Sequence, residues 1–140
     1  MTGPSLDDPA VQRFLAGKDV VILATVQPDG SPLAMPMWFL PDGATLCMLS
    51  VARTQKVRNI GGDARVCVVA EEGARGDIRG VTVLGRAAFL PDSSERRGLV
   101  DRFLAKYRPH LERLWGGRAM PADRVMFRVT PARVRTWGLG

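Results

Sequence analysis

The sequence contains very little histidine and cysteine, with one His and two Cys among 140 residues. The single histidine, His110, has no nucleophile motif near it, which argues against a serine or cysteine catalytic triad. We interpret His110, beside Pro109, as a structural or solvated side chain. Cys47 and Cys67 lie twenty residues apart without a CxxC pattern, which argues against a structural zinc site and a disulfide scaffold. They are typical of reduced core thiols in a cytosolic protein.

The sequence also lacks a long hydrophobic run, since no apolar stretch approaches the roughly 20 residues that span a bilayer. Residues 1–8 are polar and carry two acids, unlike a signal peptide. We therefore expect a cytoplasmic protein that does not bind membranes. There is no P-loop and no GxGxxG motif. Glu71 and Glu72 end a predicted strand and are interpreted as solvated turn residues rather than a glycosidase pair, so self-contained acid–base catalysis is not supported.

The charged residues of the sequence are predominantly basic, and most of the basic residues are arginines. The net charge is +6, and lysine contributes only Lys18, Lys56 and Lys106 to the 20 cationic residues. Such a surface favours an anionic partner, including a phosphorylated cofactor. The basic residues are scattered and the aromatic residues form no cluster of the RNA-binding type. We therefore do not expect nucleic acid as a partner.

The length suits a single domain over residues 1–140. A first short helix is predicted after Asp8 as N-cap and Pro9 at the first helical position, ending at Gly17. A later helix is predicted from Asp92 as N-cap, with Glu95 three residues on. Short apolar segments between turns predict about seven strands and three short helices, hence a mainly β fold built as a closed or nearly closed antiparallel barrel. The predicted strands are 20–26, 32–40, 44–51, 65–70, 81–90, 124–129 and 133–137, and the middle helix is 54–60.

The first three predicted strands follow each other closely, which predicts a three-stranded meander. Pro32 and Pro36 cannot donate ladder hydrogen bonds, so their strand must lie at an edge or be bulged. Several other strands are apolar on both faces, more than a small barrel interior uses. We therefore expect one outer face to be buried against a second subunit.

The strongest local signal for binding follows the third predicted strand, in residues 50–59. A strand ends there and a short helix opens, with Ser50 or Thr54 in a capping position. The first turn of a helix offers free N–H groups and a positive dipole end to a phosphate. Arg53 precedes that turn and Lys56 lies within it, so both cations could converge on one anion. A solvated basic helix face explains the same residues, and spacing alone leaves both interpretations open.

Four segments together resemble a known family. Residues 24–32 (ATVQPDGSP), 36–39 (PMWF), 42–43 (DG) and 56–59 (KVRN) resemble the pyridoxamine 5′-phosphate oxidase-like split β-barrel superfamily. Within it, they are most similar to the flavin/deazaflavin-dependent oxidoreductases of the B type, which use coenzyme F420. The resemblance implies a six- to seven-stranded antiparallel split β-barrel with peripheral helices. It also implies a homodimer with two cofactor sites at the subunit interface.

The resemblance assigns roles to particular residues. It implies that Arg53, Thr54 and Lys56 bind the cofactor phosphate. Arg58 of the same motif is a further cofactor-binding candidate, although Arg58 and Asn59 could be structural instead, since Arg58 lies two helical positions from Lys56 and points away from it. It implies that the cofactor ring lies along two strands, and Trp38 there is equally explained as an ordinary core or interface aromatic. Trp137, near the C-terminus, could reach the partner's site. The residues expected along the ring are Met35, Pro36, Met37, Trp38, Leu49, Ser50 and Val51.

The implied activity is hydride transfer between reduced F420 and a small conjugated organic substrate, in which the cofactor carries the chemistry. An FMN-dependent oxidoreductase, or a non-catalytic flavin-binding protein of the same fold, is the alternative. The anionic tail of F420 suits the +6 surface and favours it over FMN. The sequence departs from relatives at Leu33-Ala34 and Gly61-Gly62. It also lacks C-terminal Arg and His substrate motifs, so vitamin B6 synthesis is not expected.

Overall fold

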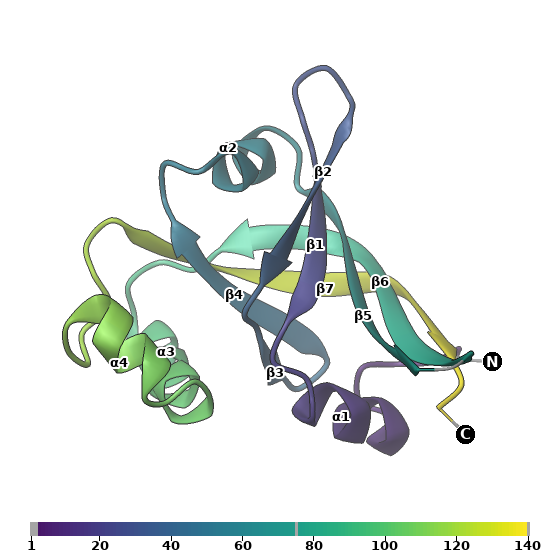
Figure 1. Ribbon diagram of the computed structural model, residues 1–140. Helices are drawn as coiled ribbons and strands as arrows, with labels where there is room; N and C mark the ends of the chain where they lie inside the picture. The colour runs from purple at the N-terminus through teal and green to yellow at the C-terminus, as the bar shows by residue number, and fades with distance from the viewer. Residues whose placement is uncertain (1–2, 75, 140) are drawn as a thin grey trace.

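The structure, a computed structural model, describes residues 3–74 and 76–139. One seven-stranded antiparallel sheet, in the order β2-β1-β5-β6-β7-β4-β3, curls into a half-barrel with the helices around it (Figure 1). This confirms the predicted mainly β, antiparallel split-barrel fold. The strands are β1 (Val21–Val26), β2 (Pro32–Met37), β3 (Leu40–Asp42), β4 (Thr45–Val51), β5 (Arg65–Ala74), β6 (Asp77–Phe89) and β7 (Arg124–Trp137). The helices are α1 (Pro9–Ala16), α2 (Gln55–Gly62), α3 (Ser94–Lys106) and α4 (His110–Trp115).

The predicted strand 32–40 is two strands that belong to opposite edges of the sheet. β2 pairs with β1, whereas β3 pairs with β4. The predicted meander is therefore wrong, because β2 and β4 are not paired; β4 pairs with β7 instead. The prolines Pro32 and Pro36 lie on the edge strand β2, as expected of residues without an N–H donor.

Two further boundaries differ from the predictions. The segments 124–129 and 133–137 form one strand, β7, with an irregularity in its pairing to β6 between Leu84 and Gly85. A Cβ at Gly85 would lie 2.4 Å from the carbonyl oxygen of Thr130, so glycine permits the close approach that keeps β7 continuous past Pro131. The N-cap of α3 is Ser93, whose Oγ accepts from the N–H of Arg96, and not the predicted Asp92.

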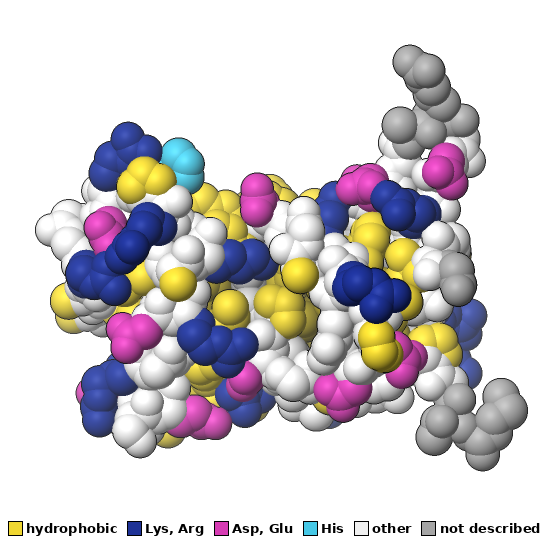
Figure 2. Space-filling view, turned by 90° about the horizontal axis from the view of Figure 1, so that it is seen from below, with side chains coloured by type: hydrophobic (Ala, Val, Ile, Leu, Met, Phe, Trp, Pro, Cys, Tyr) yellow, Lys and Arg dark blue, Asp and Glu magenta, His cyan; other side chains and the backbone are white. Residues whose placement is uncertain are grey.

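The described chain has four helices rather than three, because α4 follows Pro109 as a separate helix. None of the helices in the described ranges is both long and apolar enough to cross a membrane. On the face shown in Figure 2, Lys and Arg side chains alternate with Asp and Glu over the α3–α4 half of the molecule, and hydrophobic side chains show in a hollow beside them.

The buried hydrophobic side chains form two clusters on the two faces of the sheet. The main core fills the inside of the curl and includes Leu23, Met48 and Phe127. The second cluster lies between the outer side of β4 and the helices α3 and α4, and it includes Phe103 and Leu111. α3 and α4 therefore close one end of the fold by hydrophobic packing.

Tyr107, directly after α3, fastens the link between β2 and β3. The N–H of Phe39 donates to Tyr107 Oη at 2.8 Å, and Oη lies 2.8 Å from the Phe39 oxygen and 2.9 Å from the Asp19 oxygen, so its proton can go to either. The Tyr107 ring stacks on Trp38 with centroids 4.4 Å apart and planes 6° apart. Burial raises the pKa of Tyr107 to about 12. One side chain thus satisfies the buried backbone at the turning point between the two sheet edges.

We expect Tyr107→Phe to lower the free energy of unfolding by about 1–3 kcal/mol, because the buried N–H of Phe39 would lose its acceptor while the ring stack remains. Urea unfolding followed by circular dichroism measures this change. His110→Ala, an exposed substitution on α4, is the control and should change stability by less than about 0.5 kcal/mol. Equal stability of Tyr107→Phe and wild type would contradict the role of the hydroxyl.

Tyr107 also predicts a loss of stability at alkaline pH. Its pKa is higher in the folded chain (about 12) than the ordinary value of about 10. The stability it contributes is therefore present below about pH 10 and is lost as the pH rises toward 12. Since the chain has one tyrosine, tyrosinate absorbance reports Tyr107 alone. The native titration should lie above that of the urea-denatured chain, and coincident midpoints would contradict the prediction.

Candidate functional site

The start of α2 presents backbone donors that no N-cap side chain covers. β4 ends at Val51, and the N–H of Ala52 donates to the Asp123 oxygen at 2.8 Å, which joins this loop to the start of β7. Thr54 is the N-cap, but its Oγ1 donates back to the Val51 oxygen at 2.9 Å and makes no cap hydrogen bond to the helix. The first-turn N–H groups of α2 therefore remain available, at the positive end of the helix dipole.

Lys56, in that first turn, is half-buried and has no ion-pair or hydrogen-bond partner within the described ranges. Partial burial lowers the pKa of Lys56 from its ordinary value. A partly desolvated ammonium without a counter-charge gains from an anion placed beside it. The predicted cation at this position thus lies where it could bind a phosphate.

Arg53, the cation that could converge with Lys56 on one anion, faces a carboxylate of its own chain. Its side chain is exposed and its Nη1 lies 3.5 Å from Asp123 Oδ2. The other oxygen of that carboxylate, Oδ1, lies 2.5 Å from Arg124 Nη1. Asp123 therefore bridges two arginines at the edge of the site, an arrangement that sequence reasoning missed because Asp123 lies seventy residues from Arg53.

Arg58 and Asn59 have structural contacts, in agreement with the structural interpretation of these two positions. Arg58 donates from Nη1 to the Arg53 oxygen at 2.6 Å and from Nη2 to Gln55 Oε1 at 2.9 Å. Asn59 is buried, donates from Nδ2 to Thr25 Oγ1 at 3.0 Å and accepts from Gln55 Nε2 at 2.7 Å. These contacts hold the loop before α2 in place and attach the helix to β1.

The residues predicted along the cofactor ring do not share one face. Met37 is buried in the main core, and Met35 lies on the same side of β2, whereas Pro36 is exposed on the opposite side. Trp38 is half-buried in the link after β2 and stacks on Tyr107. A cofactor ring beside β2 would therefore meet side chains from both faces of this strand. Trp38 also has a packing role, because it stacks on Tyr107.

Three of the predicted residues line one small cavity of about 90 Å³ between β4 and the helices. Val51 follows Ser50 at the end of β4 and is half-buried. The contribution of α4 was missed, although the apolar spacing of Leu111, Leu114 and Trp115 could have revealed an amphipathic helix after Pro109. The cavity is lined by Trp38, Leu49, Ser50, Phe103, Leu111, Leu114, Trp115 and Arg124.

Trp137 lies far from this cavity within one chain. It pairs with Gly80 at the end of β7, and a Cβ at Gly80 would lie 2.4 Å from the indole ring. Arg124 is at the other end of β7, thirteen residues away, or roughly 43 Å in an extended strand. Trp137 could reach a site at α2 only from a second chain.

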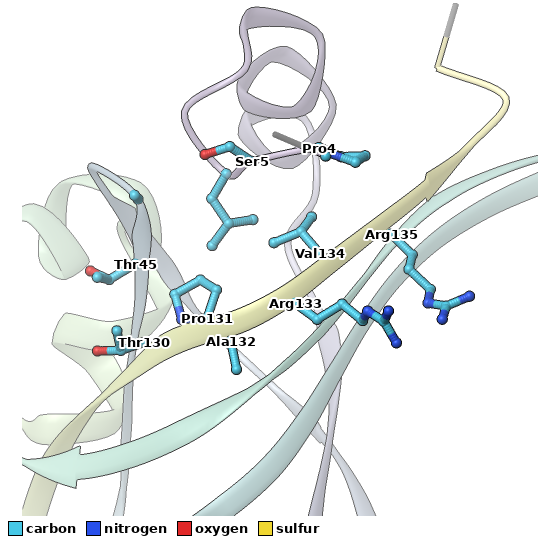
Figure 3. A pocket seen from close by; sticks show the side chains of 12 residues that line it. Pro4, Ser5, Thr45, Thr130, Pro131, Ala132, Arg133, Val134 and Arg135 are labelled. Atoms are coloured by element: carbon cyan, nitrogen blue, oxygen red, sulfur yellow. The ribbon is translucent and has the colours of Figure 1, made fainter. Parts of the chain in front are cut away.

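A hollow of about 670 Å³ elsewhere in the described chain contains none of the predicted site residues. It lies between the N-terminal segment, the β3–β4 turn and the irregular part of β7 (Figure 3). Val134 faces the N-terminal segment, whereas Arg133 and Arg135 project from the other side of β7. In the described ranges, no three His, Cys, Asp or Glu side chains are grouped to hold a metal ion.

The outer face of the sheet carries exposed hydrophobic side chains. Leu84 is 44% exposed and Ile22 is 38% exposed. Cross-strand pairing aligns Ala24 with Cys67 and Cys67 with Leu84. Cys67 is therefore a half-buried residue of this face and not a core residue, whereas Cys47 is in the core as predicted; both are free thiols. A groove of about 330 Å³ crosses the same face.

Comparison with known proteins identifies related sequences and structures. The profile of the family described as pyridoxamine 5′-phosphate oxidase matches residues 7–138. None of the curated proteins compared with the chain matches it.

Three solved structures illustrate the range of similar proteins. An F420 reductase is 27% identical, with a TM-score of 0.67 over 89% of this chain and 94% of that chain. An FAD-binding protein from Mesorhizobium loti is 26% identical, with a TM-score of 0.71 over 89% of each chain. The haem storage protein HutZ from Vibrio cholerae is 18% identical, with a TM-score of 0.78 over 92% of this chain and 93% of that one, which shows a shared fold alone.

Proposed function

The chain belongs to the pyridoxamine 5′-phosphate oxidase family, and from this membership we propose that it is an F420-dependent oxidoreductase. It transfers a hydride between the deazaflavin and a small conjugated organic substrate. The observation that carries the proposal is Lys56, a half-buried cation without a partner in the described chain, beside the uncapped first turn of α2. The helix dipole, the free first-turn amides and the Lys56 ammonium would together favour the phosphate of such a cofactor.

The donor set at α2 fits a phosphate group. The first-turn N–H groups of α2 would donate to its oxygens and Lys56 would neutralise part of its charge. Arg53 is close in the chain and exposed, and would contribute when it leaves Asp123. When bound, the cofactor supplies or accepts the hydride, so the chain itself needs only to bind, orient and shield.

The ring of the cofactor would lie beside β4 and the β2–β3 link, at the open mouth of the small cavity that Trp38, Leu49 and Ser50 line. Trp38 and Leu49 offer apolar surface there, and Ser50 offers a hydroxyl that lies 3.3 Å from Thr54 Oγ1. These residues lie on the β4 side that leads directly to the phosphate site at α2, because β4 ends three residues before Thr54. Val51 would extend this surface along β4, and Met35 and Pro36 would meet the ring from opposite faces of the edge strand β2, while Met37 supports that strand from the core.

The choice of F420 over FMN or FAD rests on charge. The chain carries a net charge of +6, which would attract the acidic tail of F420 electrostatically. Solved structures of both an F420 reductase and an FAD-binding protein resemble this chain. Haem is less favoured by the residues, because the single histidine, His110, lies exposed on α4 with Nδ1 3.1 Å from an Arg113 nitrogen.

We also propose that the protein is a homodimer with the cofactor sites at the subunit interface. The support is the outer sheet face, where Ile22, Ala24 and Leu84 present apolar surface to solvent in the single chain. Burying this surface against a second copy would stabilise the pair by the hydrophobic effect. A dimer also gives Trp137 access to a partner's site.

We expect Lys56→Ala to weaken F420 binding by roughly 1.5–3 kcal/mol, the range for hydrogen bonds to charged groups. Fluorescence titration with F420 and with FMN, on one preparation of each variant, measures the change. Lys56→Arg should retain most of the affinity, since it keeps the charge. Arg13→Ala, an exposed change on α1, is the matched control and should bind as the wild type does.

The same titration distinguishes the alternatives. Tighter binding of FMN than of F420 by the wild type would replace the cofactor assignment with the FMN alternative. Identical titrations of Lys56→Ala and wild type with both cofactors would show that the phosphate assignment is wrong. Binding without turnover of any conjugated acceptor would support a non-catalytic flavin-binding protein.

The proposed interface predicts that a charge introduced on the outer face of the sheet prevents dimerisation. Leu84→Glu should produce a monomer, because an unpaired carboxylate would be buried at the interface. Leu114→Glu places the same charge on an exposed leucine of α4 (65% exposed) and should leave the dimer intact. Size-exclusion chromatography with light scattering measures both masses. A monomeric wild type, or a dimeric Leu84→Glu, would contradict this interface.

A further inference from the structure

The cavity between β4 and the α3–α4 pair combines apolar walls with one cationic side chain. Its volume of about 90 Å³ equals the share of roughly three water molecules in the liquid. An enclosed cavity that binds benzene measures about 150 Å³, so a single small ring would fill this one and keep an edge in solvent. All of its wall residues except Ser50 and Arg124 are apolar or aromatic.

The aromatic side of the cavity is held rigidly. One face of the Trp38 ring is covered by Tyr107, at 4.4 Å between centroids. Tyr107 in turn packs against Phe103, at 6.2 Å and 21° between planes. Trp38 and Phe103, which both line the cavity, thus belong to one aromatic stack that a flat ring could join at low entropic cost.

α4 leaves its apolar side chains exposed at this cavity. Leu114 is 65% exposed, the highest value among the large hydrophobic side chains of the described chain, and Trp115 beside it is half-buried. Both residues line the cavity. A ligand seated there would remove apolar surface of α4 from water, which favours its binding.

Arg124 adds charge to this apolar site. Its side chain is only 19% exposed, and within the described ranges its guanidinium has one ion-pair partner, the half-exposed Asp123. Asp123 is shared with Arg53. A guanidinium has five N–H donors in a planar fork, so Arg124 can bind a carboxylate in addition to Asp123 or in place of it.

We propose that this cavity is the substrate subsite and that it takes a small flat aromatic carboxylate, with the ring between Trp38 and α4 and the carboxylate on Arg124. The assignment rests on the proposed function for calling the ligand a substrate, but the binding itself stands on the cavity. Arg124 is then the residue that selects anionic substrates, and Leu114 and Trp115 select for flat apolar ones.

Benzoate is the probe, with benzamide as its neutral counterpart of the same shape. Benzoate should quench the tryptophan fluorescence of the wild type saturably, and benzamide should bind about tenfold or more weakly. The quenching should remain in Trp137→Phe and decrease in Trp38→Phe and Trp115→Phe. Equal affinity for benzoate and benzamide, or no saturable binding of benzoate, would overturn the proposal.

Variants at the arginine test the charge directly. Arg124→Gln should lose about tenfold or more of its affinity for benzoate but not for benzamide, and Arg124→Lys should lose less. Asp123→Asn should bind benzoate more tightly, because a competing carboxylate is removed. If Arg124→Gln fails to fold, the pair Arg124→Lys and Asp123→Asn still decides the matter, and unchanged benzoate affinity in both would overturn the proposal.

Lys56→Ala separates this proposal from the cofactor site. It should lose F420 affinity and keep benzoate affinity, whereas Arg124→Gln should do the reverse. If benzoate binding is lost in Lys56→Ala and kept in Arg124→Gln, benzoate occupies the phosphate site and the subsite assignment is wrong. Failure of F420 binding in the wild type, with benzoate binding still dependent on Arg124, would reject only the proposed cofactor.

Discussion

The hydrogen bonds between Tyr107 and the backbone of Phe39 hold the point on which the architecture depends. At Phe39 the chain leaves one edge of the sheet and joins the opposite edge, so its polar backbone is buried away from any neighbouring strand. A buried N–H without an acceptor is costly, and Tyr107 supplies that acceptor. The same ring stacks on Trp38 and packs on Phe103, which couples the helical end of the fold to the split in the sheet.

The electrostatics of the candidate site follow from where β4 and β7 end. Their pairing brings Val51 next to Arg124, and Asp123 then lies between Arg53 and Arg124. Lys56, a few residues further on, has no such carboxylate among the described residues. Two kinds of cation therefore flank the loop before α2: arginines already paired with Asp123, and a lysine without a partner in the described chain. An incoming anion would gain most from the lysine, because no existing ion pair has to be broken.

Several elements could be predicted from local patterns because their causes are local. Pro32 and Pro36 place β2 at an edge, and the turn at Gly30, whose φ is positive, separates β1 from β2. Other features depend on distant partners. The split of the segment 32–40 depends on Tyr107, and the continuity of β7 past Pro131 depends on Gly85 across the strand. Asp123 could not be associated with Arg53 from the sequence, since the pairing of β4 with β7 brings them together.

The sequence by itself determined the mainly β antiparallel class, the family resemblance and the cations near α2, because turn residues, hydrophobic alternation and motif spacing are written within short segments. Only the tertiary structure decided which strands are neighbours, which arginine is already paired and which side chains surround Trp38. These depend on contacts between segments tens of residues apart, such as Trp38 with α4. Hydrophobic burial specifies that such segments pack together, but not which of the compatible partners meet.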